Sequence, residues 1–240
     1  MSASRLILLG LLAAASLSAT DIRSYRVRLE TAADGTGKGT AEVGLARCTA
    51  GRINLPLGFK AIAGLQLEEA PARLRLTQGP SNGQVLLQAD LPEGIPADCT
   101  FRFAFTLPAA FVPIEPGPGE KSPFPAGSRL FRHALVATQE GTIGSYRFEV
   151  LFPPGTRAQA IREQLPKPGK AEAGPRVRLG KADGRQNAVL QMSSMKQGDD
   201  TSMTLELVPE RKSWGWLLAG LALCAIYLFR FRDLVAPGRD

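Results

Sequence analysis

The segment Tyr25–Glu30, YRVRLE, decides the fold class of this chain. Its apolar residues alternate with charged residues, so Tyr25, Val27 and Leu29 share one side of an extended backbone. A helix would scatter these side chains around its axis, whereas a β-strand gathers them on one face. The same alternation recurs in FRFAFTL (101–107), YRFEVLF (146–152), RLRL (73–76), VRL (177–179) and MTLELV (203–208). The sequence therefore predicts an all-β fold of antiparallel sheets, packed as an immunoglobulin-like β-sandwich.

A segment rich in proline and glycine divides this β region. Residues 112–127 contain five prolines and three glycines, which is incompatible with a central strand and typical of a semi-rigid spacer. A linker at 113–127 predicts two sandwiches, at 20–112 and 128–212. One larger sandwich with a long connection is the alternative. In the second half, Thr156 and Gln159 have the spacing of a capping box, which predicts a short helix near 156–165.

The first apolar segment of the chain has the pattern of an export signal. Arg5 is followed by an uncharged apolar stretch and then by the small residues Ser16 and Ser18. This order predicts a secretory signal peptide over residues 1–19. A retained signal anchor is the alternative, because the cleavage site lacks the preferred alanines. Export would place the β region outside the cytoplasm.

The second apolar segment lies near the C-terminus and predicts a transmembrane helix over 213–229. Residues 214–229 contain no charge and no proline. As a helix they would be about 24 Å long, near the short end of what can cross a hydrocarbon core of about 30 Å. The residues expected to anchor the helix at the membrane interfaces are Trp214, Trp216, Tyr227, Arg230 and Arg232.

Small residues on this helix permit close packing against another helix. Gly215 and Ala219 lie one turn apart, as do Gly220 and Cys224, so a homo- or hetero-oligomer is one expectation and exposure of that face to lipid is the other. The tail, 230–240, would be cytoplasmic. The whole pattern predicts a single-pass protein of a bacterial inner membrane whose β region faces the periplasm.

Two of the three cysteines are candidates for a disulfide. Cys48 and Cys99 both fall in the predicted exported region, where oxidation is permitted. A bridge would close a loop of about 50 residues and contribute around 4 kcal/mol in the chain-entropy estimate. Two free, buried thiols are the alternative reading.

No catalytic, cofactor or metal site emerges from the sequence. The single histidine, His133, shares an apolar strand face with Phe131 and Leu135, which favours a packing role. A single histidine excludes the H-E-x-x-H and three-histidine classes of zinc site, and no G-x-S-x-G nucleophile motif is present. The net charge of +7 is spread along the chain without the clustering typical of nucleic-acid binding.

Two classes of function fit these observations. The first is a non-enzymatic interaction module, scaffold or subunit that binds a protein partner in the cell envelope, using sheet edges for pairing. The second is an envelope enzyme that acts on glycan through carboxylates distant in sequence. The sequence favours the first class, because nothing in it resembles a catalytic constellation.

Overall fold

The computed structural model describes residues 20–79, 83–114, 127–139, 141–160, 176–210 and 215–230. These residues form mostly β-strands in three sheets, together with one short helix, α1 (Gly215–Arg230). The strands are β1 (Asp21–Thr31), β2 (Gly37–Ala46), β3 (Gly51–Pro56), β4 (Ala63–Glu69), β5 (Arg75–Gln78), β6 (Leu86–Leu91), β7 (Asp98–Leu107), β8 (Phe111–Pro113), β9 (Arg129–Val136), β10 (Ile143–Leu151), β11 (Thr156–Ala160), β12 (Arg176–Ala182), β13 (Arg185–Met195) and β14 (Asp200–Pro209).

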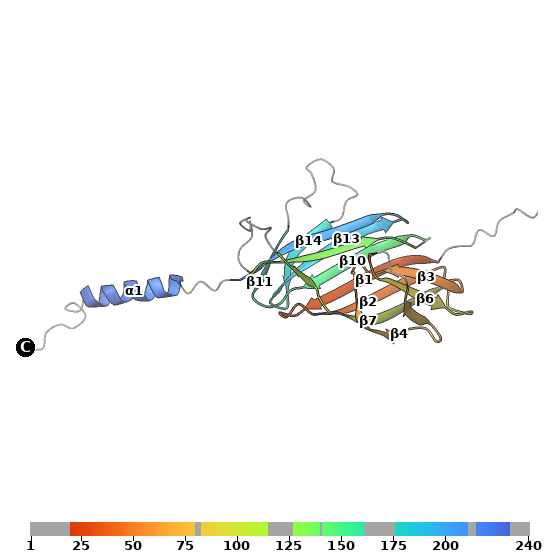
Figure 1. Ribbon diagram of the computed structural model, residues 1–240, viewed down its shortest axis with the longest axis horizontal. Coiled ribbons are helices and arrows are strands. Elements are labelled where there is room, and N and C mark those ends of the chain that lie inside the picture. Colours follow the sequence, from red (N-terminus) through yellow and green to blue (C-terminus); the bar gives the residue numbers. More distant parts are fainter. Residues whose placement is uncertain are drawn as a thin grey trace, which may run out of the picture. The chain divides into compact units, whose positions relative to one another are not determined.

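The largest sheet has seven strands in the order β12-β13-β10-β1-β2-β7-β4 (Figure 1). Its central pair, β1 and β10, is parallel, and Tyr25 lies opposite Tyr146 in that register. Every other pair in the sheet is antiparallel. The first and second halves of the chain therefore contribute neighbouring strands to one sheet.

This arrangement corrects the predicted fold. Two separate immunoglobulin-like sandwiches, 20–112 and 128–212, do not form, and the sheet is mixed rather than antiparallel. Alternation determines which side of a strand is buried but not which strand lies beside it. Both β1 and β10 have one apolar face, so they can pair across the proline-rich segment. Residues 115–126 of the predicted linker lie outside the described part of the chain.

Two smaller sheets cover the apolar face of the large one. One has the order β11-β14-β9-β8 and the other β3-β6-β5. Phe131 of β9 stacks on Phe148 of β10 with ring centroids 6.1 Å apart, and buried residues of all three sheets join a single hydrophobic core. The backbone N–H of Ala134 in β9 donates to the carbonyl of Gly58 at 3.4 Å, which links β9 to the segment that follows β3.

The predicted transmembrane helix is also wrong. Residues 215–230 do form the helix α1, but among the described residues no helix is both long and apolar enough to span a membrane. Sixteen residues give a helix of about 24 Å, against a hydrocarbon core of about 30 Å. The predicted signal peptide lies outside the described residues, and so does most of the predicted tail. The ranges concerned are 1–19, 211–214 and 231–240.

The short helix predicted near 156–165 is wrong as well. Residues 156–160 form strand β11, which pairs antiparallel with β14 so that Ala158 lies opposite Leu207. The amide of Ala158 donates to Oε1 of Gln186 at 2.8 Å, and Ala158 is buried. Tertiary pairing thus overrides the local capping signal. Residues 161–165 are outside the described part.

Gly58 lies where the smaller sheets meet, and its backbone requires glycine. Its φ is +73°, and an added Cβ would lie 2.4 Å from Cε1 of His133 and 3.0 Å from the carbonyl oxygen of Ala134. Gly94 has nearly the same φ, +75°, but open space around the position of a Cβ. Substitution of Gly94 therefore reports backbone strain alone, whereas substitution of Gly58 reports backbone strain together with steric overlap.

We expect Gly58→Ala to lower the free energy of unfolding by about 3 kcal/mol, since left-handed strain and overpacking each contribute. Gly94→Ala should lower the free energy of unfolding by only about 1–2 kcal/mol, because backbone strain is its only contribution. Urea unfolding of both variants measures the difference. Equal losses would show that His133 moves aside freely, contrary to the close packing inferred at this position.

Candidate functional site

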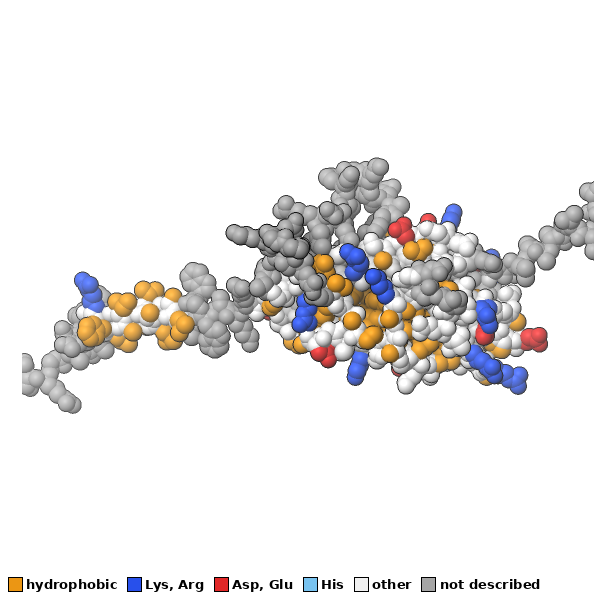
Figure 2. Space-filling view, viewed as in Figure 1, with side chains coloured by type: hydrophobic (Ala, Val, Ile, Leu, Met, Phe, Trp, Pro, Cys, Tyr) orange, Lys and Arg blue, Asp and Glu red, His pale blue; other side chains and the backbone are white. Residues whose placement is uncertain are grey.

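The side of the seven-stranded sheet that faces away from the core carries alternating basic and acidic residues. We call it the open face. The register aligns its side chains in rows across the strands, because partners in neighbouring strands point to the same side. One row runs through Gln191 of β13, Arg147 of β10, Arg26 of β1, Glu42 of β2 and Arg102 of β7. Figure 2 shows one side of the molecule, on which basic and acidic side chains are scattered among hydrophobic ones.

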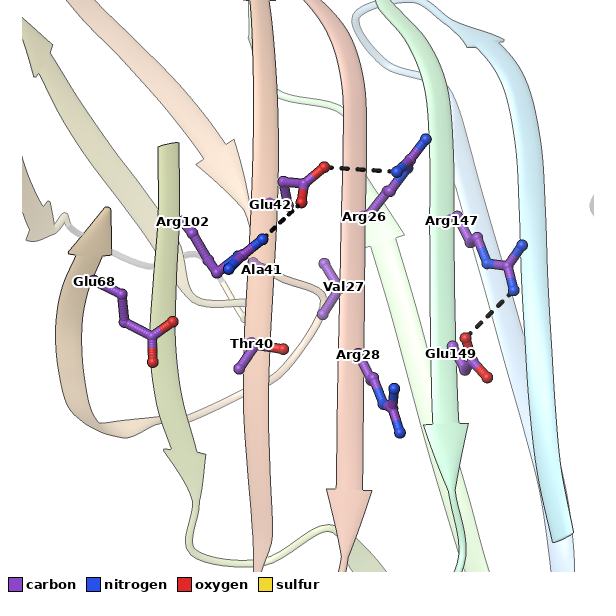
Figure 3. Close-up of a pocket in the computed structure, with 10 residues that line it drawn as sticks. All are labelled: Arg26, Val27, Arg28, Thr40, Ala41, Glu42, Glu68, Arg102, Arg147 and Glu149. Atoms are coloured by element: carbon purple, nitrogen blue, oxygen red, sulfur yellow. Dashed lines mark hydrogen bonds and ion pairs between the residues drawn. The ribbon is translucent and has the colours of Figure 1, made fainter. Parts of the chain in front are cut away.

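A shallow hollow of about 460 Å³ lies on the open face. Figure 3 shows its ten lining residues, which come from β1, β2, β4, β7 and β10. Four of them are arginines, namely Arg26, Arg28, Arg102 and Arg147, and three are glutamates, namely Glu42, Glu68 and Glu149. The side chains of Val27 and Ala41 lie in the core on the other side of the sheet, so Thr40 is the short side chain on the floor, and the long charged side chains can extend over it.

Glu42 connects two of these arginines. Its Oε1 lies 3.6 Å from Nη1 of Arg26, and its Oε2 accepts from Nη2 of Arg102 at 3.2 Å. Nη1 of Arg102 reaches Glu69 at 3.4 Å. The hydrogen bond that Arg102 donates to Glu42 and the charge of Glu69 raise the pKa of Arg102. Such exposed pairs contribute little to stability individually, but together they fix the orientation of the guanidinium groups.

Arg26 and Arg147 are direct neighbours of like charge in the parallel pair β1–β10. Arg147 is paired with Glu149 at 3.3 Å, and Glu149 also accepts from Nδ2 of Asn187 at 3.0 Å. The arginine side chains are 66% and 48% exposed respectively. Like charges placed side by side oppose folding slightly, and each guanidinium has five N–H donors. The exposed donors can bind carboxylates of another molecule.

The described residues contain no group of three or more histidine, cysteine, aspartate or glutamate side chains that could hold a metal ion. The open face is instead suited to polar recognition. Its arginines can make charge-assisted, bidentate hydrogen bonds to carboxylates. Sequence reasoning missed this site, because it required knowing that β10 lies beside β1. The outward residues of YRVRLE and YRFEVLF were the available signal.

His133 lies inside the core, as the sequence predicts. Its ring stacks on Phe148 with centroids 3.9 Å apart, and its Nε2 shares a hydrogen bond of 2.8 Å with Oη of Tyr146. Nδ1 has no hydrogen-bond partner among the described residues, and neither has Oη of the adjacent Tyr25. Burial lowers the pKa of His133 to about 3 and raises the pKa of both tyrosines.

Cys48 and Cys99 lie side by side, with their sulfurs 3.6 Å apart. Both are half-buried and present as thiols. Burial, and then the hydrogen bond with Cys48, raise the pKa of the Cys99 thiol to about 12. The predicted disulfide therefore stays a prediction, but its two sulfurs are already neighbours.

The other predicted site residues belong to α1 or its flanks. Tyr227 is 61% exposed and Arg230 is the last residue of the helix. The backbone of Gly215, Trp216, Ala219 and Gly220 is helical. Trp214 and Arg232 lie outside the described residues. The membrane-interface role of these residues stays a prediction.

Comparison with known proteins gives only distant similarity. No family model matches the sequence, and no curated protein matches it at the stringency required of a relative. A provisionally assigned protease from Parabacteroides distasonis is 9% identical with a TM-score of 0.43, over 79% of this chain and 40% of that one. An M1 zinc metallopeptidase from Deinococcus radiodurans, solved with a Tyr-Ser-Ala substrate, is 15% identical with a TM-score of 0.38, over 80% of this chain and 43% of that one.

A provisionally assigned nutrient-binding protein from Legionella pneumophila is 11% identical with a TM-score of 0.45, over 78% of this chain and 66% of that one. The similar structures thus include enzymes. This chain spans less than half the length of the first two structures. At these values the similarities assign no activity to it.

The cysteine pair should oxidise readily. In a Cys224→Ser background, oxidised glutathione is expected to convert the two thiols of Cys48 and Cys99 into a disulfide, with two glutathione thiols released. The free energy of unfolding should rise by around 4 kcal/mol by the loop-entropy estimate. Intact mass and thiol titration follow the reaction, and Cys48→Ser is the control. Persistence of two titratable thiols would contradict the proximity of the pair.

The buried His133 should make the fold sensitive to acid. The unfolded ring takes up a proton below its usual pKa of 6.5, whereas the folded ring stays neutral down to about 3. Stability should therefore fall as the pH drops through this window, by about 1.4 kcal/mol per pH unit. His133→Phe keeps the ring stacking but does not titrate. Urea unfolding at several pH values gives the free energy of unfolding as a function of pH. This free energy should fall less steeply with decreasing pH in the variant than in the wild type. The same pH dependence in both proteins would contradict a neutral, buried histidine.

Proposed function

We propose that this chain is a non-enzymatic interaction module whose open face binds a protein partner. The observation that carries the proposal is the set of four arginines around the hollow, held on β10, β1 and β7 with side chains that are 43–66% exposed. Arginine is enriched in protein interfaces and among the residues that dominate binding energy.

The construction of the face supports recognition of a macromolecule. The hollow is shallow and extends over five strands, which fits a broad partner surface better than an enclosed small molecule. The strands beneath it are fixed by the core on their other side. Glu42 and Glu149 orient Arg26, Arg102 and Arg147 in advance, so less side-chain freedom is lost on binding.

Co-purification with matched double variants tests the proposal. The tagged full chain is recovered from its native cells as wild type, as Arg26→Ala/Arg147→Ala and as Arg52→Ala/Arg75→Ala. The control arginines lie on β3 and β5, both opposite Asp90. We expect a partner whose recovery falls at least about tenfold in the first variant, corresponding to a loss of 1.4 kcal/mol or more, and is unchanged in the second.

Thermal unfolding of each variant must match the wild type, so that lost binding is not lost folding. Equal recovery of the partner in both variants would exclude the open face as its binding surface. Recovery of the wild-type chain alone, as a single species, would overturn the interaction role itself.

A further inference from the structure

Strand β12 lies at one end of the seven-stranded sheet. It pairs with β13 through a two-residue turn, Asp183-Gly184, in which both residues have positive φ, 54° and 71°. Ala182 and Arg185 close this turn and so form a hydrogen-bonded pair. Because such pairs alternate in an antiparallel ladder, the N–H and C=O groups of Val177, Leu179 and Lys181 point away from β13.

These outward groups form a regular, exposed edge. The register from Arg176 to Ala182 is unbroken, and no residue in the described part of the chain pairs with the other side of β12. Leu179 is 43% exposed, although it is a large apolar residue. An extended strand with unpaired backbone groups and an exposed apolar side chain is a template for a further strand.

The opposite end of the same sheet is built differently. The pairing of β4 with β7 shifts register twice, between Ala63 and Gln66 and again between Leu67 and Glu69. Gly64 there has a φ of +59°. Such bulges disrupt a ladder and prevent further pairing. The chain thus blocks one edge of the sheet and leaves the other regular.

The charge of β12 indicates which segment it could accept. Arg176, Arg178 and Lys181 are basic, and the strand contains no acidic residue. A second copy paired with this edge would bring the positive charges of both strands together, which opposes self-association. An acidic segment would neutralise them. Arg178 lies opposite Val189, on the same side of the sheet as the hollow, so acidic side chains of an added strand would continue the open face.

We propose that β12 accepts an extended acidic segment of a partner protein as an eighth strand of the sheet. The inference rests on the proposed role as an interaction module. Apolar residues of the segment lie beside Leu179, and its acidic residues lie beside Arg178. Backbone hydrogen bonds to Val177, Leu179 and Lys181 supply the pairing, and the alternating side chains supply selectivity.

Short labelled peptides test the edge directly with the full chain. One peptide alternates valine with glutamate, and the other alternates valine with lysine. Fluorescence anisotropy should show binding of the acidic peptide at least about tenfold tighter than that of the basic one. Arg178→Glu should reduce or reverse this preference. Equal affinity for both peptides, or no binding of either, would overturn the proposal.

Leu179→Pro separates backbone pairing from charge. The N–H of Leu179 points away from β13, so proline removes a donor of the free edge and leaves the β12–β13 ladder intact. Affinity for the acidic peptide should fall at least about tenfold, whereas Leu179→Ala, which keeps the donor, should lose much less. Unchanged binding by Leu179→Pro, with wild-type thermal unfolding, would overturn the proposal.

Two further measurements distinguish the competing outcomes. If mass photometry shows a dimer that Leu179→Pro dissociates, the edge pairs with a second copy and the acidic partner is excluded. The native co-purification is then repeated with Leu179→Pro. Loss of the partner supports pairing at β12. Retention of a partner that still depends on Arg26 and Arg147 would overturn this inference while leaving the proposed function in place.

Discussion

The parallel pairing of β1 with β10 is the constraint on which the rest of the structure depends. It joins segments more than a hundred residues apart and sets Tyr25 beside Tyr146 in the core and Arg26 beside Arg147 on the open face. A slip of one residue would turn the arginines inward and the tyrosines to solvent. The burial of the aromatic residues therefore fixes the register, and the register in turn assembles the arginines. The same strand register therefore determines both the core and the candidate site.

The core beneath this strand pair contains buried polar groups. Oη of Tyr25 and Nδ1 of His133 are buried without partners among the described atoms, and each such group costs about 1–3 kcal/mol. The stacking of His133 on Phe148 and its bond to Tyr146 offset part of this. The same crowding explains why position 58 needs a residue without a side chain. The aromatic cluster is stable only if the histidine is neutral and Gly58 leaves room for it.

The sequence predicted the strands better than their arrangement. Period-two alternation identified the buried face of β1, β7, β10 and β14, because burial of that face is local to each strand. It could not show that β10 pairs with β1, since any strand with one apolar face is an eligible neighbour. The helix expected at 156–165 failed for a related reason: pairing of Ala158 with Leu207 outweighed a local cap. The open face went unnoticed because it exists only once that pairing is known. The disulfide between Cys48 and Cys99 stays a prediction, although the structure places the two sulfurs 3.6 Å apart.

The open face and the β12 edge are continuous, and this continuity has a consequence for recognition. Residues in register across the sheet lead from Glu42 through Arg26, Arg147 and Gln191 to Arg176 at the edge. A strand added to β12 would extend each of these rows by one position. Its backbone would fix the partner's direction and register, while the rows of arginines would select the charge of the remaining contacts. Backbone pairing alone is tolerant of sequence, and exposed ion pairs alone are weak. Backbone pairing at β12 and ion pairs on the open face together can provide a selectivity that neither provides separately. A partner must pair with β12 in the correct register before its carboxylates lie over the arginines.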